Sequence, residues 1–296
     1  MTRARDVANS TTALSVDGTV KLDGNYPVGT GNVALGDTAL DSGSLSGSSN
    51  TALGSGALTA NTTGSNTAVG RNALYNNTTG STNTGIGQQA LTTNTTGSSN
   101  TALGRDSLLS NTTASNNTAV GYQAGYAVTT GTHNTFVGSN SGDATDNGNR
   151  NTALGFLSLS ANAGDNNTAI GTQALINTTG ASNTAVGKDA AFYNTSGSNN
   201  VALGESALLN NTTASNNTAV GYQAGLNNTT GLANTFIGGI SGSSVTTGTR
   251  NTFVGHNSGQ AITTGYKNTI VGRFTGNSGG LDIRTSSNNI VLSDGD

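Results

Sequence analysis

The chain has 296 residues, of which 32% are hydrophobic and 8% are charged, with a formal net charge of −3 and no cysteine. This charge gives no electrostatic footprint for nucleic acid or an anionic membrane, and the missing cysteines exclude disulfides and thiolate metal sites. No apolar run approaches the length of a membrane span, and none follows the first residues as in a secretory signal peptide. We therefore expect no membrane insertion and no secretory leader.

Residues 1–31 precede the repeats and are expected to form an N-terminal cap or attachment segment. Two short runs that alternate apolar and polar residues, 12–16 and 19–22, flank Asp17 and Gly18. Asp-Gly between alternating runs is a strong signal for a β-hairpin. A hairpin here would cover the open edge of the first repeat.

Residues 32–276 contain fifteen copies of one phrase, Asn-Thr-small-aliphatic-Gly, as in residues 66–70. The low apolar content would also suit a disordered chain, but the apolar residues keep the same place in every copy. The copies are 16 to 18 residues apart, mostly 17, as measured between the glycines that close each phrase. These glycines are Gly36, Gly54, Gly70, Gly87, Gly104, Gly121, Gly138, Gly155, Gly171, Gly187, Gly204, Gly221, Gly238, Gly255 and Gly272.

This period is too short for a helical-hairpin repeat or a propeller blade and fits one rung of a β-solenoid. The sequence therefore predicts an all-β parallel β-solenoid, or β-roll, of about fifteen rungs with one continuous core. At about 4.8 Å per rung the rod would be on the order of 70 Å long.

Positions within a rung are numbered here from the closing glycine as zero. Position −3 is Thr except at Val33 and Val201, position −2 is mostly Ala, and position −1 is always Val, Leu or Ile. Alternate residues of a strand share a face. We expect the strict aliphatic at −1 to form the solenoid core, and the small residue at −2 to pack against another backbone.

Position −4 is Asn in every rung, and stacked asparagines can form a ladder of side-chain amides. The closing glycine is expected at a corner that needs a positive φ. Positions +3 and +4, often Ala-Leu, predict a second short strand in each rung. The asparagines at −4 are Asn32, Asn50, Asn66, Asn83, Asn100, Asn117, Asn134, Asn151, Asn167, Asn183, Asn200, Asn217, Asn234, Asn251 and Asn268.

Residues 277–296 depart from the repeat. Ser278, Gly279 and Gly280 break the phase, and residues 289–293 then resemble the phrase with Ser in place of the closing Gly. We expect this segment to lead into a tip or a further domain.

The phrase resembles the repeats of trimeric adhesin heads, which are left-handed parallel β-rolls, although the period here is longer and Thr stands at −3. Residues 117–125 and 134–138, with the entry 16–27 and the exit 288–296, more closely resemble marine and cyanobacterial bacteriophage tail fibres. This resemblance implies a parallel homotrimer whose partners are other phage tail proteins and a host receptor, with a glycan as one candidate. It also implies a location in the virion after assembly in the host cytoplasm.

We therefore interpret the chain as the shaft of a bacteriophage tail fibre that positions a receptor-binding tip. One alternative is a bacterial surface adhesin or a self-assembling extracellular filament. A second is an ice-binding or other flat-ligand solenoid. The alternation of Thr with Asn along the strand speaks against the second, because an ice-binding face usually presents two Thr per strand.

Few residues suggest chemistry. His133 and His256 lie seven rungs apart, and a metal site needs converging ligands. Asp143, Asp146 and Asp165 fall in neighbouring loops and could form a weak calcium site, although solvated loop charge explains them better. We expect no metal, no cofactor and no enzymatic activity.

Six tyrosines lie in loops or just after a closing glycine, where they could stack on sugars or pack: Tyr75, Tyr122, Tyr126, Tyr193, Tyr222 and Tyr266. Residues 111–125 and 211–225 are identical, an offset of 100 residues or six rungs. This duplication includes Tyr122 and Tyr222, which favours a recurrent packing role for them over a unique site.

Overall fold

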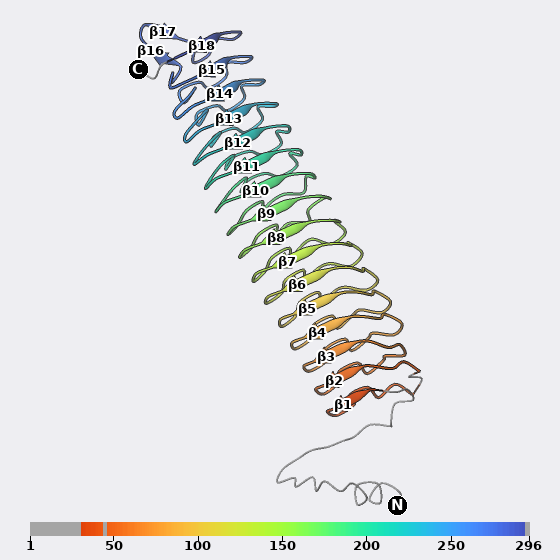
Figure 1. Ribbon diagram of the computed structural model, residues 1–296. Coiled ribbons are helices and arrows are strands. Elements are labelled where there is room, and N and C mark those ends of the chain that lie inside the picture. Colours follow the sequence, from red (N-terminus) through yellow and green to blue (C-terminus); the bar gives the residue numbers. More distant parts are fainter. Residues whose placement is uncertain (1–30, 44–45, 294–296) are drawn as a thin grey trace, which may run out of the picture.

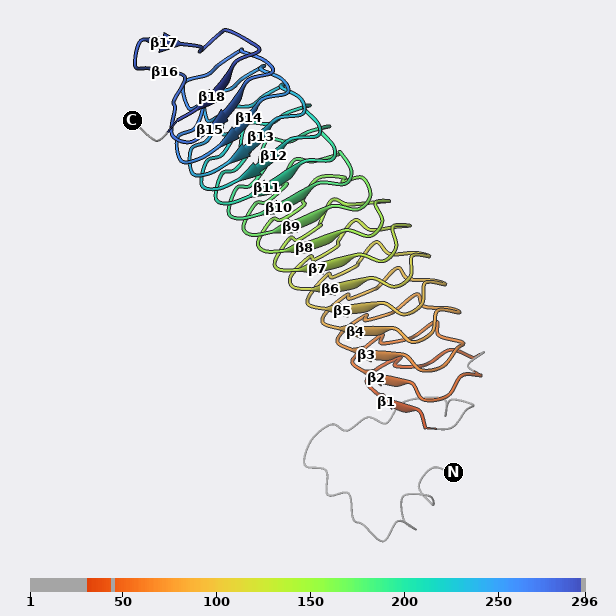
Figure 2. The same ribbon diagram turned by 45° about the horizontal axis from the view of Figure 1, so that its top comes forward.

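The computed structural model describes residues 31–43 and 46–293, and these form an elongated rod of stacked rungs (Figures 1 and 2). They contain strands and turns and no helix. The predicted hairpin over 12–22 lies outside the described residues. Sixteen strands form one sheet: β1 (Val33–Leu35), β2 (Thr51–Leu53), β3 (Thr67–Val69), β4 (Thr84–Ile86), β5 (Thr101–Leu103), β6 (Thr118–Val120), β7 (Thr135–Val137), β8 (Thr152–Leu154), β9 (Thr168–Ile170), β10 (Thr184–Val186), β11 (Val201–Leu203), β12 (Thr218–Val220), β13 (Thr235–Ile237), β14 (Thr252–Val254), β15 (Thr269–Val271) and β18 (Ile290–Leu292).

Every neighbouring pair in this sheet is parallel and in register. Between β6 and β7, for example, Thr118 pairs with Thr135, Ala119 with Phe136 and Val120 with Val137. Each position of the phrase therefore forms a straight row along the rod. The predicted parallel β-solenoid of about fifteen rungs is confirmed.

Each rung holds one strand, so the predicted second strand at +3 and +4 is wrong. The chain turns there, with positive φ at +2 and +4, such as 57° at Asn72 and 52° at Leu74. The turn still bonds between rungs: the backbone N–H of Asn72 donates to the carbonyl of Ser55 at 2.9 Å, and that of Leu74 to the carbonyl of Ala90 at 2.9 Å. Left-handed backbone in a Leu is costly, and these bonds help to offset the cost.

The assignment of the core to position −1 is also wrong. Positions −2 and −4 face the interior: Ala68 and Asn66 are fully buried, and their counterparts from the second rung to the fifteenth, Gly85 included, are buried as well. The aliphatic residues at −1 face outward, for example Leu103, which is 45% exposed. The interior is narrow and already holds the Leu at +4, so a small residue must stand opposite it.

The core obeys a volume rule between positions −2 and +4 of the same rung. Ala at −2 usually accompanies Leu at +4, as in Ala68 and Leu74, whereas Phe253 accompanies Gly259. A Cβ built on Gly259 would lie 2.4 Å from the ring of Phe253. A large side chain therefore enters the same space from either strand or turn, but never from both, because close-packed interiors leave no spare volume.

The departure after the fifteenth rung is an insertion in the turn. It contains a two-stranded antiparallel hairpin of β16 (Asn277–Ser278) and β17 (Leu281–Asp282), at the upper end of Figure 1. The rung pattern then resumes, and β18 pairs with β15 in the common register, with Thr269 opposite Ile290.

Candidate interaction face

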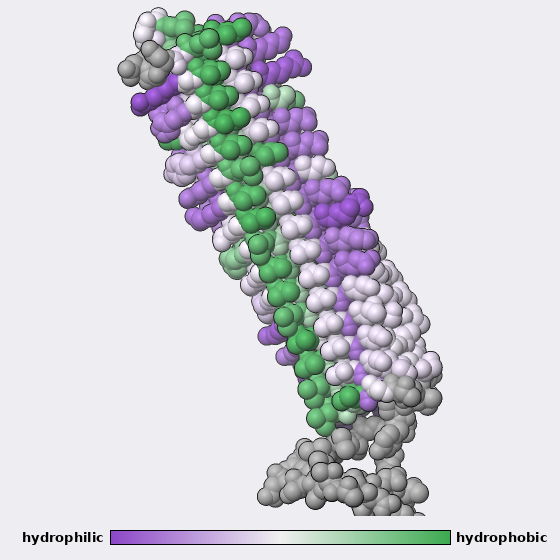
Figure 3. All heavy atoms as spheres, viewed as in Figure 1, coloured by the Kyte–Doolittle hydropathy of each residue, from purple (hydrophilic) through white to green (hydrophobic). Residues whose placement is uncertain are grey.

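The most continuous surface feature is the row of aliphatic side chains at −1. These residues are exposed or half-buried in every described rung, with Leu53 at 43% exposure and Leu154 at 47%. Figure 3 shows them as an unbroken hydrophobic row along the rod. Single exposed apolar residues are normal, but a long contiguous patch marks an interaction site.

A row of threonines at −3 runs beside the aliphatic row, since both positions point outward from the same strands. None of these threonines has a side-chain hydrogen bond to another residue in the described part of the chain. Their hydroxyls are therefore available to solvent or to a partner. We call the rows at −3 and −1 together the outer face.

The flatness of the outer face depends on the closing glycines, whose φ values are positive, for example 131° at Gly87. A Cβ added there would lie 2.5 Å from the carbonyl oxygen of Gly104 in the next rung. Glycine is needed both for the backbone angle and for the close approach between rungs.

The asparagines at −4 hold the strand to its neighbours from inside. The backbone N–H of Asn83 donates to Oδ1 of Asn66 at 3.0 Å, and Nδ2 of Asn83 donates to the carbonyl of Gly97 at 2.8 Å. This ladder is mainly side chain to backbone, and some rungs add the expected amide-to-amide bond, such as Nδ2 of Asn100 to Oδ1 of Asn83 at 3.2 Å. Because the amides are buried and bonded, they stabilise the stacking and are not accessible to a ligand.

A second ladder at +7 was missed. Nδ2 of Asn94 donates to Oδ1 of Asn77 at 2.6 Å, and Nδ2 of Asn111 donates to Oδ1 of Asn94 at 2.6 Å. The ladder stops where Val128 occupies the position in the next rung, and Oδ1 of Asn111 has no partner among the described residues. The recurrence of Asn seven residues after the closing glycine was a signal that could have revealed it.

The candidate metal ligands do not converge. Within the described ranges no three His, Asp or Glu residues could hold a metal ion together. His133 and His256 lie in different rows, at −5 and +1, seven rungs apart.

The three loop aspartates bind chain atoms instead. Asp143 accepts from Nδ2 of Asn140 at 3.2 Å, and Asp146 accepts from the hydroxyl of Thr129.

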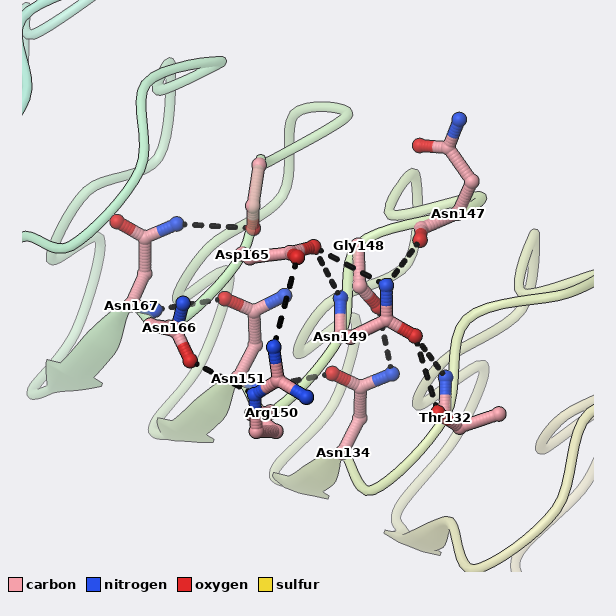
Figure 4. A network of polar contacts seen from close by, with 11 residues as sticks. Thr132, Asn134, Asn147, Gly148, Asn149, Arg150, Asn151, Asp165, Asn166 and Asn167 are labelled. Atoms are coloured by element: carbon pink, nitrogen blue, oxygen red, sulfur yellow. Dashed lines mark hydrogen bonds and ion pairs between the residues drawn. The ribbon is translucent and has the colours of Figure 1, made fainter.

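Asp165 belongs to a surface network drawn in Figure 4. Its carboxylate accepts the backbone N–H of Asn149 at 2.9 Å and lies 3.8 Å from the guanidinium of Arg150. These bonds, chiefly the backbone one, lower the pKa of Asp165. The network links neighbouring rungs.

Position +1 forms a variable row. It includes Arg105, Tyr122, Phe156 and Lys188, all exposed, and the guanidinium of Arg105 lies 5.7 Å from the ring centroid of Tyr122. Tyr222 occupies the same row, whereas Tyr126 and Tyr266 lie elsewhere in the rung. The exposed tyrosines are therefore spread over several rows and form no single aromatic platform.

No helix among the described residues has the length and apolar character to cross a membrane. No protein-family model, no curated protein and no solved structure matches the chain. The outer face is therefore the feature on which a functional interpretation depends.

Proposed function

We propose that this chain is the shaft of a bacteriophage tail fibre, in which three copies lie parallel with their outer faces together. The observation that carries the proposal is the unbroken aliphatic row at −1, from Leu35 to Val271. Burying such a row along a whole rod would contribute a large hydrophobic stabilisation. The free threonine hydroxyls at −3 would find partners across the same contact.

In this proposal the function is mechanical. A rod of in-register rungs transmits distance and stiffness, and it would place a receptor-binding tip on the host surface. Other tail proteins and a host receptor, with a glycan as one candidate, are the partners that this role requires, and the virion is its location. The support is the regular rod together with the resemblance of its phrases to tail fibres.

The decisive experiment is the solution mass, measured by light scattering on a sizing column. We expect three times the chain mass of 29.2 kDa. Leu103→Asp with Leu154→Asp should give folded monomers, because two charges would then be buried in each contact. The matched control is Leu232→Asp, at a residue 46% exposed that lies outside the strands. A wild-type monomer would contradict the proposal.

A flat-ligand or ice-binding solenoid is the second candidate. The specific observation in its favour is that the threonines at −3 stand on the outer face with free hydroxyls, in register at every strand of the sheet except β1, β11 and β18. It differs from the first candidate in requiring that the outer face be open to solvent. A monomeric mass with thermal hysteresis would establish it, and no hysteresis from a monomer would remove it.

A further inference from the structure

Asn147 and Gly148 form the only Asn-Gly step in the sequence. Asparagine is among the chemically labile residues of proteins, and glycine after it leaves the backbone nitrogen unhindered. Asn147 is exposed, and its side chain has no hydrogen bond to any other described residue. Figure 4 shows its side chain directed away from the network around Asn149.

The backbone N–H of Gly148 also makes no hydrogen bond to another described residue, as is true of the equivalent Gly97, Gly231 and Gly248. The equivalent N–H of Gly131 donates to the carbonyl of Asp146 in the following rung at 3.3 Å. The N–H of Gly148 meets no such acceptor in the described chain. In the same part of the rod the buried Nδ2 of Asn151 has no hydrogen-bond partner among the described residues.

Two other asparagines of the described chain that precede a serine are protected. Asn140 precedes Ser141, whose N–H donates to the carbonyl of Gly138 at 3.3 Å. Asn257 precedes Ser258, whose N–H donates to the carbonyl of Gly255 at 3.2 Å. A nitrogen held in this way is not free to attack the preceding side chain.

We infer that Asn147 is a site of spontaneous deamidation in the folded protein. The backbone nitrogen of Gly148 loses its proton to solvent and attacks Cγ of Asn147, and Nδ2 leaves as ammonia. Water then opens the five-membered imide. Cleavage of the Cγ–N bond gives aspartate, and cleavage of the bond to the backbone carbonyl carbon gives isoaspartate, in which the chain runs through Cγ.

Isoaspartate would disturb the ladder. The carbonyl of Gly148 accepts Nδ2 of the buried Asn134 at 2.8 Å, and an extra methylene in the backbone before Gly148 would displace that carbonyl. A buried donor left unpaired is destabilising. We therefore expect the rung of Asn134 to open more often once isoaspartate has formed.

The test is peptide mapping by mass spectrometry after long incubation of the folded wild-type chain at mildly alkaline pH. Asn147 should be deamidated several-fold more than Asn140 or Asn257, and Asn147→Ser should abolish that signal. A peptide of residues 143–150, incubated alongside, shows that the conditions suffice. Deamidation of the peptide while Asn147 in the folded chain stays intact, or reacts no faster than Asn140, would overturn the inference.

Hydrogen exchange gives a second readout. Aged wild type should lose protection around Asn134, whereas Asn147→Ser treated in the same way should not. Equal protection in an aged sample shown to contain isoaspartate would overturn the structural consequence.

Discussion

At the scale of the residue, the same amino acid meets different constraints two positions apart. Gly87 has a φ of 131°, and a Cβ on it would lie 2.5 Å from a backbone oxygen, whereas Gly85 has no such angle and its nearest neighbours would lie 3.3 Å away. Gly87 is required by the backbone. Gly85 stands where most rungs carry Ala.

Gly87→Ala should therefore destabilise the rod by at least about 2 kcal/mol, through both strain and overlap. Gly85→Ala, its matched control in the same strand, should be neutral or stabilising by up to about 1 kcal/mol, because it restricts the unfolded chain. Denaturant midpoints compare the two. Equal losses of stability in the two variants would mean that the close approach of the rungs is not what requires glycine at position zero.

The volume rule of the core also belongs to this scale. Phe253→Ala should cost about 3–5 kcal/mol, because it leaves a cavity. Adding Gly259→Leu should recover most of that loss, since Leu at +4 with Ala at −2 is the common pair and Leu accepts the left-handed backbone elsewhere in the chain. The check is chemical denaturation of both variants. A double variant no more stable than Phe253→Ala would show that the two positions do not share one space.

At the scale of the element, the ladder at +7 consists of runs of consecutive rungs with Asn at that position. The place of an Asn within its run is predicted to decide how much it contributes to the free energy of unfolding. Asn94→Val removes the donor to Oδ1 of Asn77 and creates a new buried unpaired oxygen, at a cost of about 1–3 kcal/mol. Asn228 ends its run below Val245, and its own Oδ1 is already unpaired. Asn228→Val only moves the unpaired oxygen to Asn211 and should be close to neutral.

Thermal and denaturant unfolding of these two variants measure the difference. Both replace Asn with the same residue at a fully buried position. If Asn228→Val proved as destabilising as Asn94→Val, the hydrogen bonds to Oδ1 along the run would not be what stabilises the stacking of the rungs.

The strand and its register could be predicted because the phrase repeats at one period, and in-register stacking follows from that. The direction of the side chains could not, because a period of two leaves either face available as the core. Invariant aliphatics at −1 suggested burial, yet the space inside is set by Leu74 and its counterparts at +4. The pairing of Phe136 with Gly142 was the visible evidence that position −2 faces that space.

The rest of the rung was predicted less well. Ala-Leu at +3 and +4 has the composition of a strand, and the left-handed angle at Leu74 has no signature in residue type, although Asn at +2, as in Asn72, tolerates such an angle. For the candidate interaction face, the sequence predicted that positions −3 and −1 share one side of the strand. The structure shows that this side is the exposed one.

At the scale of the whole molecule, the six-rung duplication predicts that length is adjustable. Deleting residues 121–220 joins Val120 to Gly221 and leaves the surrounding sequence unchanged, because 111–125 and 211–225 are identical. The product should fold as a rod shorter by roughly 29 Å, six rungs of about 4.8 Å. It would also place Asn228 above Asn111, giving the unpaired Oδ1 a donor.

Small-angle scattering reports the maximum dimension, and circular dichroism reports the fold. A control deletion of residues 121–212, which is out of phase with the rungs, should fail to fold or should aggregate. If the in-phase deletion also failed, the rungs would not be independent units.

The variable row at +1 has a practical consequence. Most rungs present one exposed side chain there, and Arg, Tyr, Phe, Lys and Glu all occur, while the residues that hold the rung together lie elsewhere. The +1 positions are thus spaced regularly along the rod, and their residues can be substituted without changing the distance between rungs. Reporter groups attached at Arg105 and Glu205 would sit a fixed six rungs apart, and the separation of any other pair could be chosen in steps of a single rung.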